Sequence, residues 1–294
     1  MSTKFKAELA LVSVCLAWGI SYLLTDFCLT VMGTFTLNAF RFLLAFLVAG
    51  VCAFKNLKKV NRTTLKFSAA NAILLMAVYV CSSLGVIYTS VSNAGFLCCI
   101  AVLFTPFLEF FFFKKFPKKK TFLVAFVATV GIALMTLDEQ YRFAFGDLIC
   151  ITCSIIYAVY LMITEVVVKR DDVDAFHLGV FQLGFTGIYC LIVSFLFETP
   201  VLPSTPALWA SAIFLAVFCT GFAVIVQSVA QKYTSATNVS VIFCLEPLFA
   251  GIAAFVFANE RLLPRANVGA LILLLSLVWM EVDIPALLGK KNKK

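Results

Sequence analysis

Apolar runs of about 20 residues recur from one end of the 294-residue chain to the other. A helix of that length spans the hydrocarbon layer of a bilayer. A membrane β-strand instead has about ten residues of alternating polarity, and no stretch of this chain alternates in that way. Charged residues make up only 13% of the sequence, about half the share typical of soluble domains. The sequence therefore predicts an all-α integral membrane protein.

Ten transmembrane helices are predicted, joined by connections too short to hold a soluble domain. Their expected bounds are 7–26, 34–54, 67–89, 92–113, 120–138, 146–168, 176–197, 207–231, 235–257 and 265–287. The first span follows Lys4 and Lys6 and lacks a small-residue cleavage site. We therefore expect it to be retained rather than removed as a signal peptide.

The basic residues predict the orientation of the chain. Nineteen of the 23 fall on one side of the predicted bundle, at positions 4–6, 55–66, 114–120, 169–170, 232 and 290–294. Lysine and arginine collect in cytoplasmic loops, so we expect a multi-pass protein of the cytoplasmic (plasma) membrane with both termini in the cytoplasm. Because the net charge of +8 comes mainly from these short segments, nucleic acid is not an expected partner.

The stretch 233–280 repeats the stretch 88–135 without a gap. Both begin with Tyr-Thr-Ser-x-x-Asn, and the constant offset also places Cys99 on Cys244. A weak internal repeat in an apolar chain is typical of secondary transporters. The sequence predicts two repeats, residues 1–138 and residues 139–294, the second ending in a short basic tail.

Each predicted repeat holds five spans, which is an odd number. The second repeat must therefore enter the membrane with the opposite polarity. This predicts two inverted-topology five-helix repeats, an arrangement in which the two halves can exchange roles during alternating access.

Several short motifs occur in the same order as in a known family of carriers. They are Trp18-Gly19-x-Ser21-Tyr22, Arg41-Phe42, YTSVSNAGF at 88–96, Gly146-Asp147-Leu148, Gln182, Glu246-Pro247 and Asn259-Glu260-Arg261-Leu262. Together they resemble the EamA-like branch of the drug/metabolite transporter superfamily over essentially the whole chain. The resemblance implies a ten-helix secondary carrier for small metabolites or drugs, usually an exporter, that uses no ATP. Lys114-Lys115 stands where members often have an acidic residue, so this loop is expected to make different contacts.

Two charged residues fall inside predicted spans. Glu246 lies near the middle of its span, where burial disfavours the charged form of a carboxyl, as a proton-coupling group requires. The alternative is structural: Glu246 hydrogen-bonds a neighbouring helix. Arg41 lies near the outer end of its span and could extend to the interface, pair with Glu246 or bind an anionic group of a substrate. Pro247 and Pro106 are predicted helix kinks.

Aromatic and polar residues near span centres predict the wall of a substrate cavity. They are Trp18, Ser21, Tyr22, Tyr79, Ser82, Ser83, Tyr157, Tyr160, Gln182 and Gln227. Aromatic faces with a few hydrogen-bonding groups suit amphipathic substrates such as apolar or aromatic amino acids. Any one of these residues could instead serve as a contact between helices.

Eleven cysteines do not predict a metal or redox site. Nearly all of them lie inside apolar spans, and the chain has a single histidine, His177. A metal site needs clustered ligands, whereas a free cysteine packs well as a small polarizable core residue. No cofactor or metal is expected.

The expected function is secondary active transport of small organic metabolites, such as amino acids, or of drugs, with export as the expected direction. The expected partners are a small-molecule substrate, the lipid bilayer, and protons if Glu246 couples transport, for a monomer or weak homodimer. An uptake carrier for a vitamin or sugar derivative and a non-transporting membrane scaffold are the alternatives. An enzyme is not expected, because Ser-x-x-Lys and Gly-x-Ser-x-Gly motifs do not occur.

Overall fold

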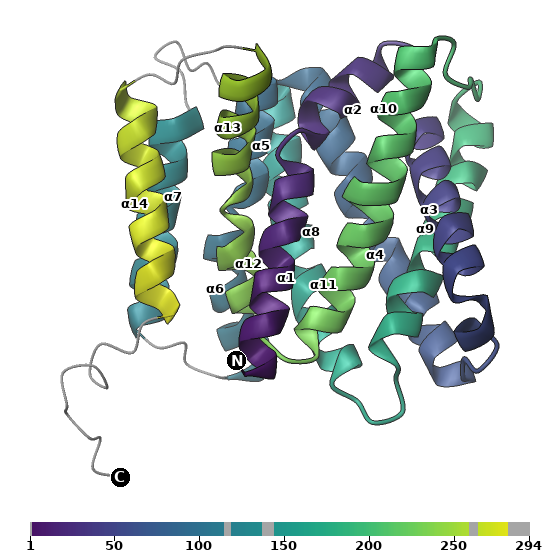
Figure 1. Cartoon of the computed structure of the whole chain (residues 1–294), viewed down its shortest axis with the longest axis horizontal. Coiled ribbons are helices and arrows are strands. Elements are labelled where there is room, and N and C mark those ends of the chain that lie inside the picture. Colours follow the sequence, from purple (N-terminus) through teal and green to yellow (C-terminus); the bar gives the residue numbers. More distant parts are fainter. Residues whose placement is uncertain (1, 115–118, 137–143, 259–263, 282–294) are drawn as a thin grey trace.

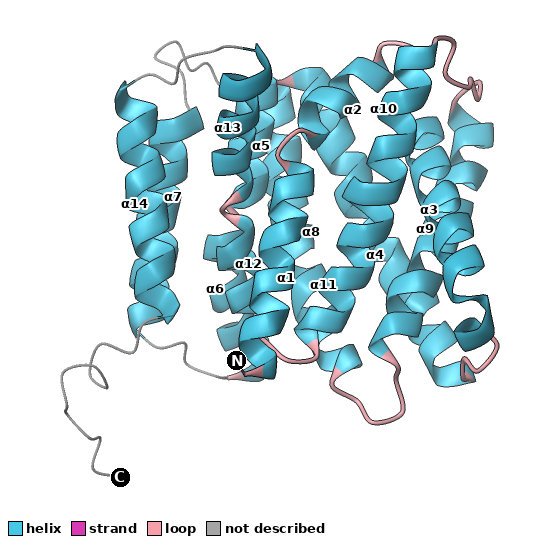
Figure 2. Cartoon of the chain, viewed as in Figure 1, coloured by secondary structure: helices cyan, strands magenta, loops and turns pink. Residues whose placement is uncertain are grey.

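The structure is a computed structural model of the whole chain, and it describes residues 2–114, 119–136, 144–258 and 264–281. Every regular element in these ranges is a helix (Figure 2), which confirms the predicted all-helical class there. The Asn259-Glu260-Arg261-Leu262 motif, Lys115 and the basic tail 290–294 lie outside the described residues.

In chain order the helices are α1 (Thr3–Trp18), α2 (Ser21–Leu29), α3 (Thr34–Leu57), α4 (Arg62–Tyr88), α5 (Val91–Cys99), α6 (Ala101–Phe113), α7 (Lys119–Thr136), α8 (Phe145–Val168), α9 (Ala175–Phe197), α10 (Pro206–Ala216), the π-helix η1 (Val217–Phe222), α11 (Ala223–Gln231), α12 (Ala236–Phe243), α13 (Glu246–Ala258) and α14 (Pro264–Glu281). They run side by side between two opposite faces of the bundle (Figure 1). The lower face in this view is the one at which α1 and α4 begin and α8 ends. The upper face is the one at which α3 and α8 begin.

Seven helical stretches among the described residues are long and apolar enough to cross a membrane. They are Thr3–Leu29, Thr34–Leu57, Arg62–Tyr88, Ala94–Phe112, Phe145–Val168, Ala175–Phe197 and Pro206–Gln231. Large apolar side chains are exposed on the outside of the bundle, among them Val51 (81% exposed) and Phe197 (78% exposed). Such a surface is suited to lipid rather than water. The protein is thus a multi-pass membrane protein, while the number of ten spans and the inversion of the two repeats stay predictions.

Small residues allow neighbouring helices to approach closely. A Cβ atom at Gly187 of α9 would lie 2.9 Å from the backbone nitrogen of Leu43 in α3, and one at Gly131 of α7 would lie 2.9 Å from the carbonyl oxygen of Gly269 in α14. Without a large hydrophobic effect between helices in lipid, such close backbone packing supplies much of their association. The predicted repeats make α3 equivalent to α9 and α7 equivalent to α14, so both pairs join equivalent helices.

Two helix pairs are interrupted at equivalent positions. α5 stops at Cys99 and α6 starts at Ala101, while α12 stops at Phe243 and α13 starts at Glu246. The offset of the sequence repeat places Ala101 on Glu246. Pro247 lies in the first turn of α13, where a missing backbone donor is tolerated.

The first interruption has a different relation to proline. At this break the backbone hydrogen bonds change from the i→i−4 to the i→i−3 pattern. The nitrogen of Leu103 donates to the carbonyl oxygen of Ile100 over 2.8 Å. Pro106 lies farther along, inside α6. The break therefore precedes the residue at which the sequence predicts a kink.

Candidate functional site

A cavity of about 90 Å³ lies inside the bundle, which is room for several water molecules. Its lining comes from both halves of the chain and includes Trp18, Ser21, Tyr22, Thr25, Arg41, Leu75, Val78, Tyr79, Ser82, Ser83, Cys98, Cys99, Ala101, Cys153, Tyr157, Val224, Gln227, Ser240, Phe243 and Glu246. The structure thus brings most of the predicted wall residues to one cavity. Whether they bind a substrate stays a prediction.

Two aromatic side chains of the cavity share one backbone acceptor. The indole Nε1 of Trp18 donates to the carbonyl oxygen of Cys219 over 2.8 Å, and the hydroxyl of Tyr79 donates to the same oxygen over 3.2 Å. Cys219 lies in η1, where a π-helical turn departs from the regular α-helical hydrogen-bond ladder. Sequence reasoning missed this segment, because a π-turn has no composition signal comparable to a proline or a glycine-rich loop.

The remaining wall is built from packed rings. The ring centroids of Trp18 and Phe243 lie 4.8 Å apart, and the ring of Tyr157 is stacked with that of Phe243 at 6.4 Å. The hydroxyl of Tyr157 donates to the Oε1 atom of Gln227 over 3.2 Å. One end of this wall is therefore aromatic, with hydrogen-bonding groups at its edges.

Arg41 is buried at the cavity, with 4% of its surface exposed. Its Nε donates to the hydroxyl oxygen of Thr220 over 3.1 Å, and its Nη1 donates to that of Thr25 over 3.4 Å. The guanidinium carbon lies 5.1 Å from the ring centroid of Tyr79, a distance at which a cation is attracted to the ring face. The side chain therefore does not extend to the interface, and its acceptors are neutral.

Glu246 lies on the same cavity, at the start of α13, with 9% of its surface exposed. Among the described residues, its carboxyl makes no hydrogen bond and no ion pair, with Arg41 or with any other side chain. Two of the alternatives raised by the sequence, a pairing with Arg41 and a hydrogen bond to a neighbouring helix, are therefore not formed among the described residues. Arg41 and Glu246, a basic and an acidic side chain, thus line one cavity without forming an ion pair.

Tyr160 and Gln182 do not line the cavity. The Oε1 atom of Gln182 accepts from Asn71 over 3.0 Å and from the hydroxyl of Tyr160 over 3.4 Å, and its Nε2 donates to Ser228 over 2.9 Å. These fully buried groups connect α4, α8, α9 and α11. Tyr160 and Gln182 therefore form contacts between helices and are not part of the cavity wall.

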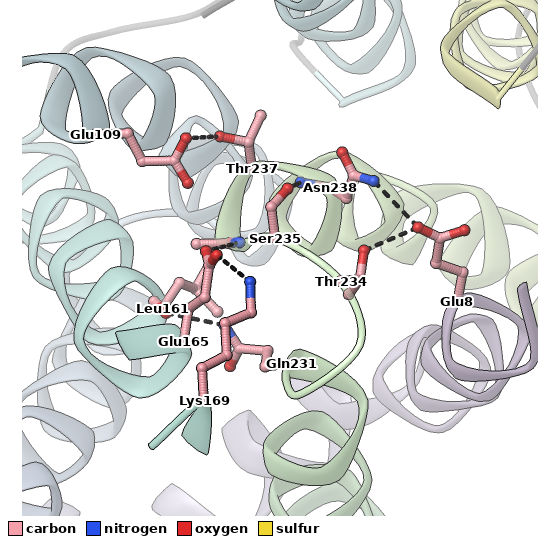
Figure 3. Close-up of polar contacts among 11 residues, drawn as sticks. Glu8, Glu109, Leu161, Glu165, Lys169, Gln231, Thr234, Ser235, Thr237 and Asn238 are labelled. Carbon is pink, nitrogen blue, oxygen red and sulfur yellow. Dashed lines mark hydrogen bonds and ion pairs between the residues drawn. The ribbon is translucent and has the colours of Figure 1, made fainter. Parts of the chain in front are cut away.

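Three carboxylates surround the start of α12 at the lower face (Figure 3). Glu165 accepts from the backbone nitrogen of Ala236 over 2.6 Å and pairs with Lys169. Glu109 accepts from the hydroxyl of Thr237 over 2.7 Å. The third, Glu8, is described next, and Glu8, Glu109 and Glu165 together are called the carboxylate cluster.

Glu8 of α1 connects to the segment that leads into α12. Its Oε1 accepts from the hydroxyl of Thr234 over 2.8 Å and from Nδ2 of Asn238 over 3.1 Å. Negative groups are favoured at a helix N-terminus, so the carboxylate cluster both stabilises α12 and ties it to α1, α6 and α8. These contacts lie at the lower end of the bundle, where α1 begins and α8 ends.

At the equivalent place on the upper face, the described residues include the carboxylate of Asp147. The hydroxyl of Thr89, which the repeat aligns with Thr234, donates to Asp147 over 2.6 Å. The other oxygen of Asp147 accepts from the backbone nitrogen of Ala144 at the start of α8. Asp147 therefore connects the end of α4 to the start of α8 at this face.

Comparison with known proteins bears on this arrangement. The model of the EamA-like transporter family matches residues 5–137 and again residues 144–281. The chain belongs to the EamA-like transporter family. This EamA-like protein is similar to two proteins of Archaeoglobus fulgidus, each named an uncharacterized transporter. One is 24% identical over 279 residues, covering 95% of this chain and 86% of the relative, and the other is 26% identical over 266 residues, covering 87% and 90%.

A solved crystal structure shares the fold of this EamA-like protein. It superposes with a TM-score of 0.79 at 15% sequence identity and covers 94% of this chain and 96% of that chain. At that identity the likeness concerns the fold alone. Family membership, the names of the relatives and the apolar helices together identify a membrane transporter.

Proposed function

We propose that this protein is a secondary active transporter that exports small organic metabolites, amino acids in particular, by alternating access. The observation that carries the proposal is the cavity within the helical bundle, which Arg41 and Glu246 both line without forming an ion pair with any described residue. Charged groups inside a membrane protein are costly and usually serve a substrate or ion pathway. Aromatic rings beside them suit the apolar part of an amphipathic solute.

The proposed architecture is ten spans in two inverted repeats, residues 1–138 and 139–294. The matching interruptions before Ala101 and Glu246 support it, as does the packing of α3 on α9 and of α7 on α14. The ends of helices at the lower face carry Lys55, Lys169 and Arg170, which supports a cytoplasmic lower face in a plasma membrane protein.

In the proposed transport step, the helices that meet at the lower face move apart. A cavity of about 90 Å³ is smaller than the roughly 300–1,000 Å³ of most ligand sites, so a solute enters only after helices move apart. The carboxylate cluster joins α12 to α1, α6 and α8 at that face. Breaking these contacts would open the cavity toward the lower side, while the unbroken cluster keeps it closed there.

Counterflow in proteoliposomes tests the proposal. Purified protein is reconstituted with an internal excess of one unlabelled amino acid, sugar or cationic drug, and entry of the labelled compound is followed. We expect transient accumulation of at least one small metabolite, and its loss in Tyr79→Ala but not in Ile73→Ala, whose side chain is 60% exposed on the outside of α4. A panel without any counterflow would contradict transport and would favour the membrane scaffold.

A further inference from the structure

We propose that Arg41 is the anion-binding group of the cavity and that the transported solute therefore carries a carboxylate. This assignment rests on the proposed transport function and narrows its substrate class to organic acids, amino acids included. It is drawn from the hydrogen bonds that Arg41 makes and from those that it leaves unmade.

The first observation is an incomplete set of hydrogen bonds. A guanidinium has five N–H donors in a planar fork. Among the described residues, Arg41 uses Nε toward Thr220 and Nη1 toward Thr25, and Nη2 has no protein acceptor. Since Arg41 is 96% buried and lines the cavity, the open edge of the fork is available to a molecule inside it.

The second observation is uncompensated charge. Both acceptors of Arg41 are neutral hydroxyls, and no described carboxylate lies within 4.0 Å of the guanidinium. A buried ion without a partner is strongly unfavourable, and the face of the Tyr79 ring offsets only part of the cost. A carboxylate brought by the solute would supply both the missing charge and the acceptors, in the paired geometry that arginine favours.

The third observation is that Thr220 and Thr25 hold the guanidinium of Arg41 in one orientation. The hydroxyl of Thr220 donates to the carbonyl of Leu215 over 2.8 Å, so its oxygen is left to accept from Arg41. Within the described lining, Arg41 is also the one lysine or arginine side chain. An anionic group in the cavity thus has a single, oriented cation to bind.

The experiment compares matched probes on the full-length protein in proteoliposomes. The first set is phenylalanine, phenylalaninamide, 3-phenylpropionate and phenethylamine, and the second is the leucine series with the same end groups. Each compound is tested as an inhibitor of counterflow for whichever panel compound the wild-type protein transports. We expect the carboxylates to inhibit about ten- to a hundredfold better than the amide and the amine, the range of a hydrogen bond to a charged group.

Variants assign this preference to Arg41. Arg41→Gln should weaken inhibition of counterflow by the carboxylates by a similar factor, and it should leave inhibition by the amide and the amine unchanged. Arg170→Gln, in the loop after α8, is the matched control and should change none of them. Size-exclusion profiles and melting temperatures check folding. If Arg41→Gln does not fold, Arg41→Lys replaces it. The lysine ammonium keeps the charge but lacks the planar guanidinium, so inhibition by the carboxylates should weaken several-fold.

The outcomes separate this assignment from the transport proposal. Counterflow of sugars or cationic drugs with no inhibition by any carboxylate would leave transport standing and overturn the role of Arg41. A carboxylate preference that persists in a folded Arg41→Gln or Arg41→Lys protein would also overturn it. No counterflow of any compound would reject both.

Discussion

The Nε atom of Arg41 lies 3.1 Å from the hydroxyl oxygen of Thr220, a residue of the π-helix η1. This contact joins α3 to a π-helix, and it holds a buried cation beside the cavity. The pairing of Arg41 with Thr220 could not be predicted from sequence, because a π-turn changes the direction in which a side chain leaves the helix.

Thr220→Val tests the importance of this contact. The change removes the acceptor of Arg41 while keeping the shape of the side chain, so we expect a loss of about 1–3 kcal/mol of stability and a weaker carboxylate preference. Thermal unfolding and the inhibition series measure both. Thr152→Val, at an exposed position of α8, is the control and should leave both unchanged. If Thr220→Val matches Thr152→Val in both stability and carboxylate preference, Thr220 does not position Arg41.

Glu246→Gln tests proton coupling. The amide keeps the size of the side chain but cannot exchange a proton, so uphill transport driven by a pH gradient should be lost and the pH dependence of transport should flatten, while counterflow continues. Asp26→Asn, at an exposed position of α2, should retain the pH response. A pH-driven flux that survives in Glu246→Gln would assign coupling to another group.

Glu165→Ala tests the closure at the lower face. Removing the acceptor of the Ala236 amide and the partner of Lys169 should shift the protein toward the state that is open at this face, by about tenfold or more. Cys98, Cys99 and Cys153 line the cavity, so membrane-impermeant thiol reagents added on that side should label them faster. Asp172→Ala, in an exposed ion pair at the same face, should not change the labelling rate. Unchanged labelling in Glu165→Ala would contradict the role of the carboxylate cluster.

Gly187→Ala tests the packing of α9 on α3. Its new methyl group would lie 2.8 Å from the side chain and 2.9 Å from the backbone of Leu43, so we expect destabilisation of about 1–3 kcal/mol. Gly50→Ala is the matched change on α3, where nothing lies within 4 Å, and it should stabilise by about 0.4–1 kcal/mol. Thermal unfolding compares them, and a shift of the same sign for both would argue against tight packing at Gly187.

The helices were predictable because long apolar runs leave a chain few alternatives in a bilayer. Most of the cavity wall was predictable for a related reason: Trp18, Tyr79 and Gln227 are polar or amphipathic groups deep in apolar spans. Such groups face a cavity or a neighbouring helix, and sequence cannot separate the two. Tyr160 and Gln182 illustrate the second case: Tyr160 bonds to Gln182, and Gln182 bonds in turn to α4 and α11.

The carboxylate cluster was not predictable. Glu8, Glu109 and Glu165 come from three separate segments, and each on its own has the features of an ordinary charge near a helix end. Only the fold brings them to the start of α12. The break before Ala101 also has no local signal, because Pro106 lies farther along, inside α6.

The proposed function requires that a solute crosses the membrane through this cavity. The most direct measurement is counterflow by Ser82→Trp, which places a large ring in the cavity, compared with Ile73→Trp, which places the same ring on the outside of the same helix. We predict that Ser82→Trp loses counterflow while Ile73→Trp retains it, with both proteins folded. Full counterflow by Ser82→Trp would contradict it.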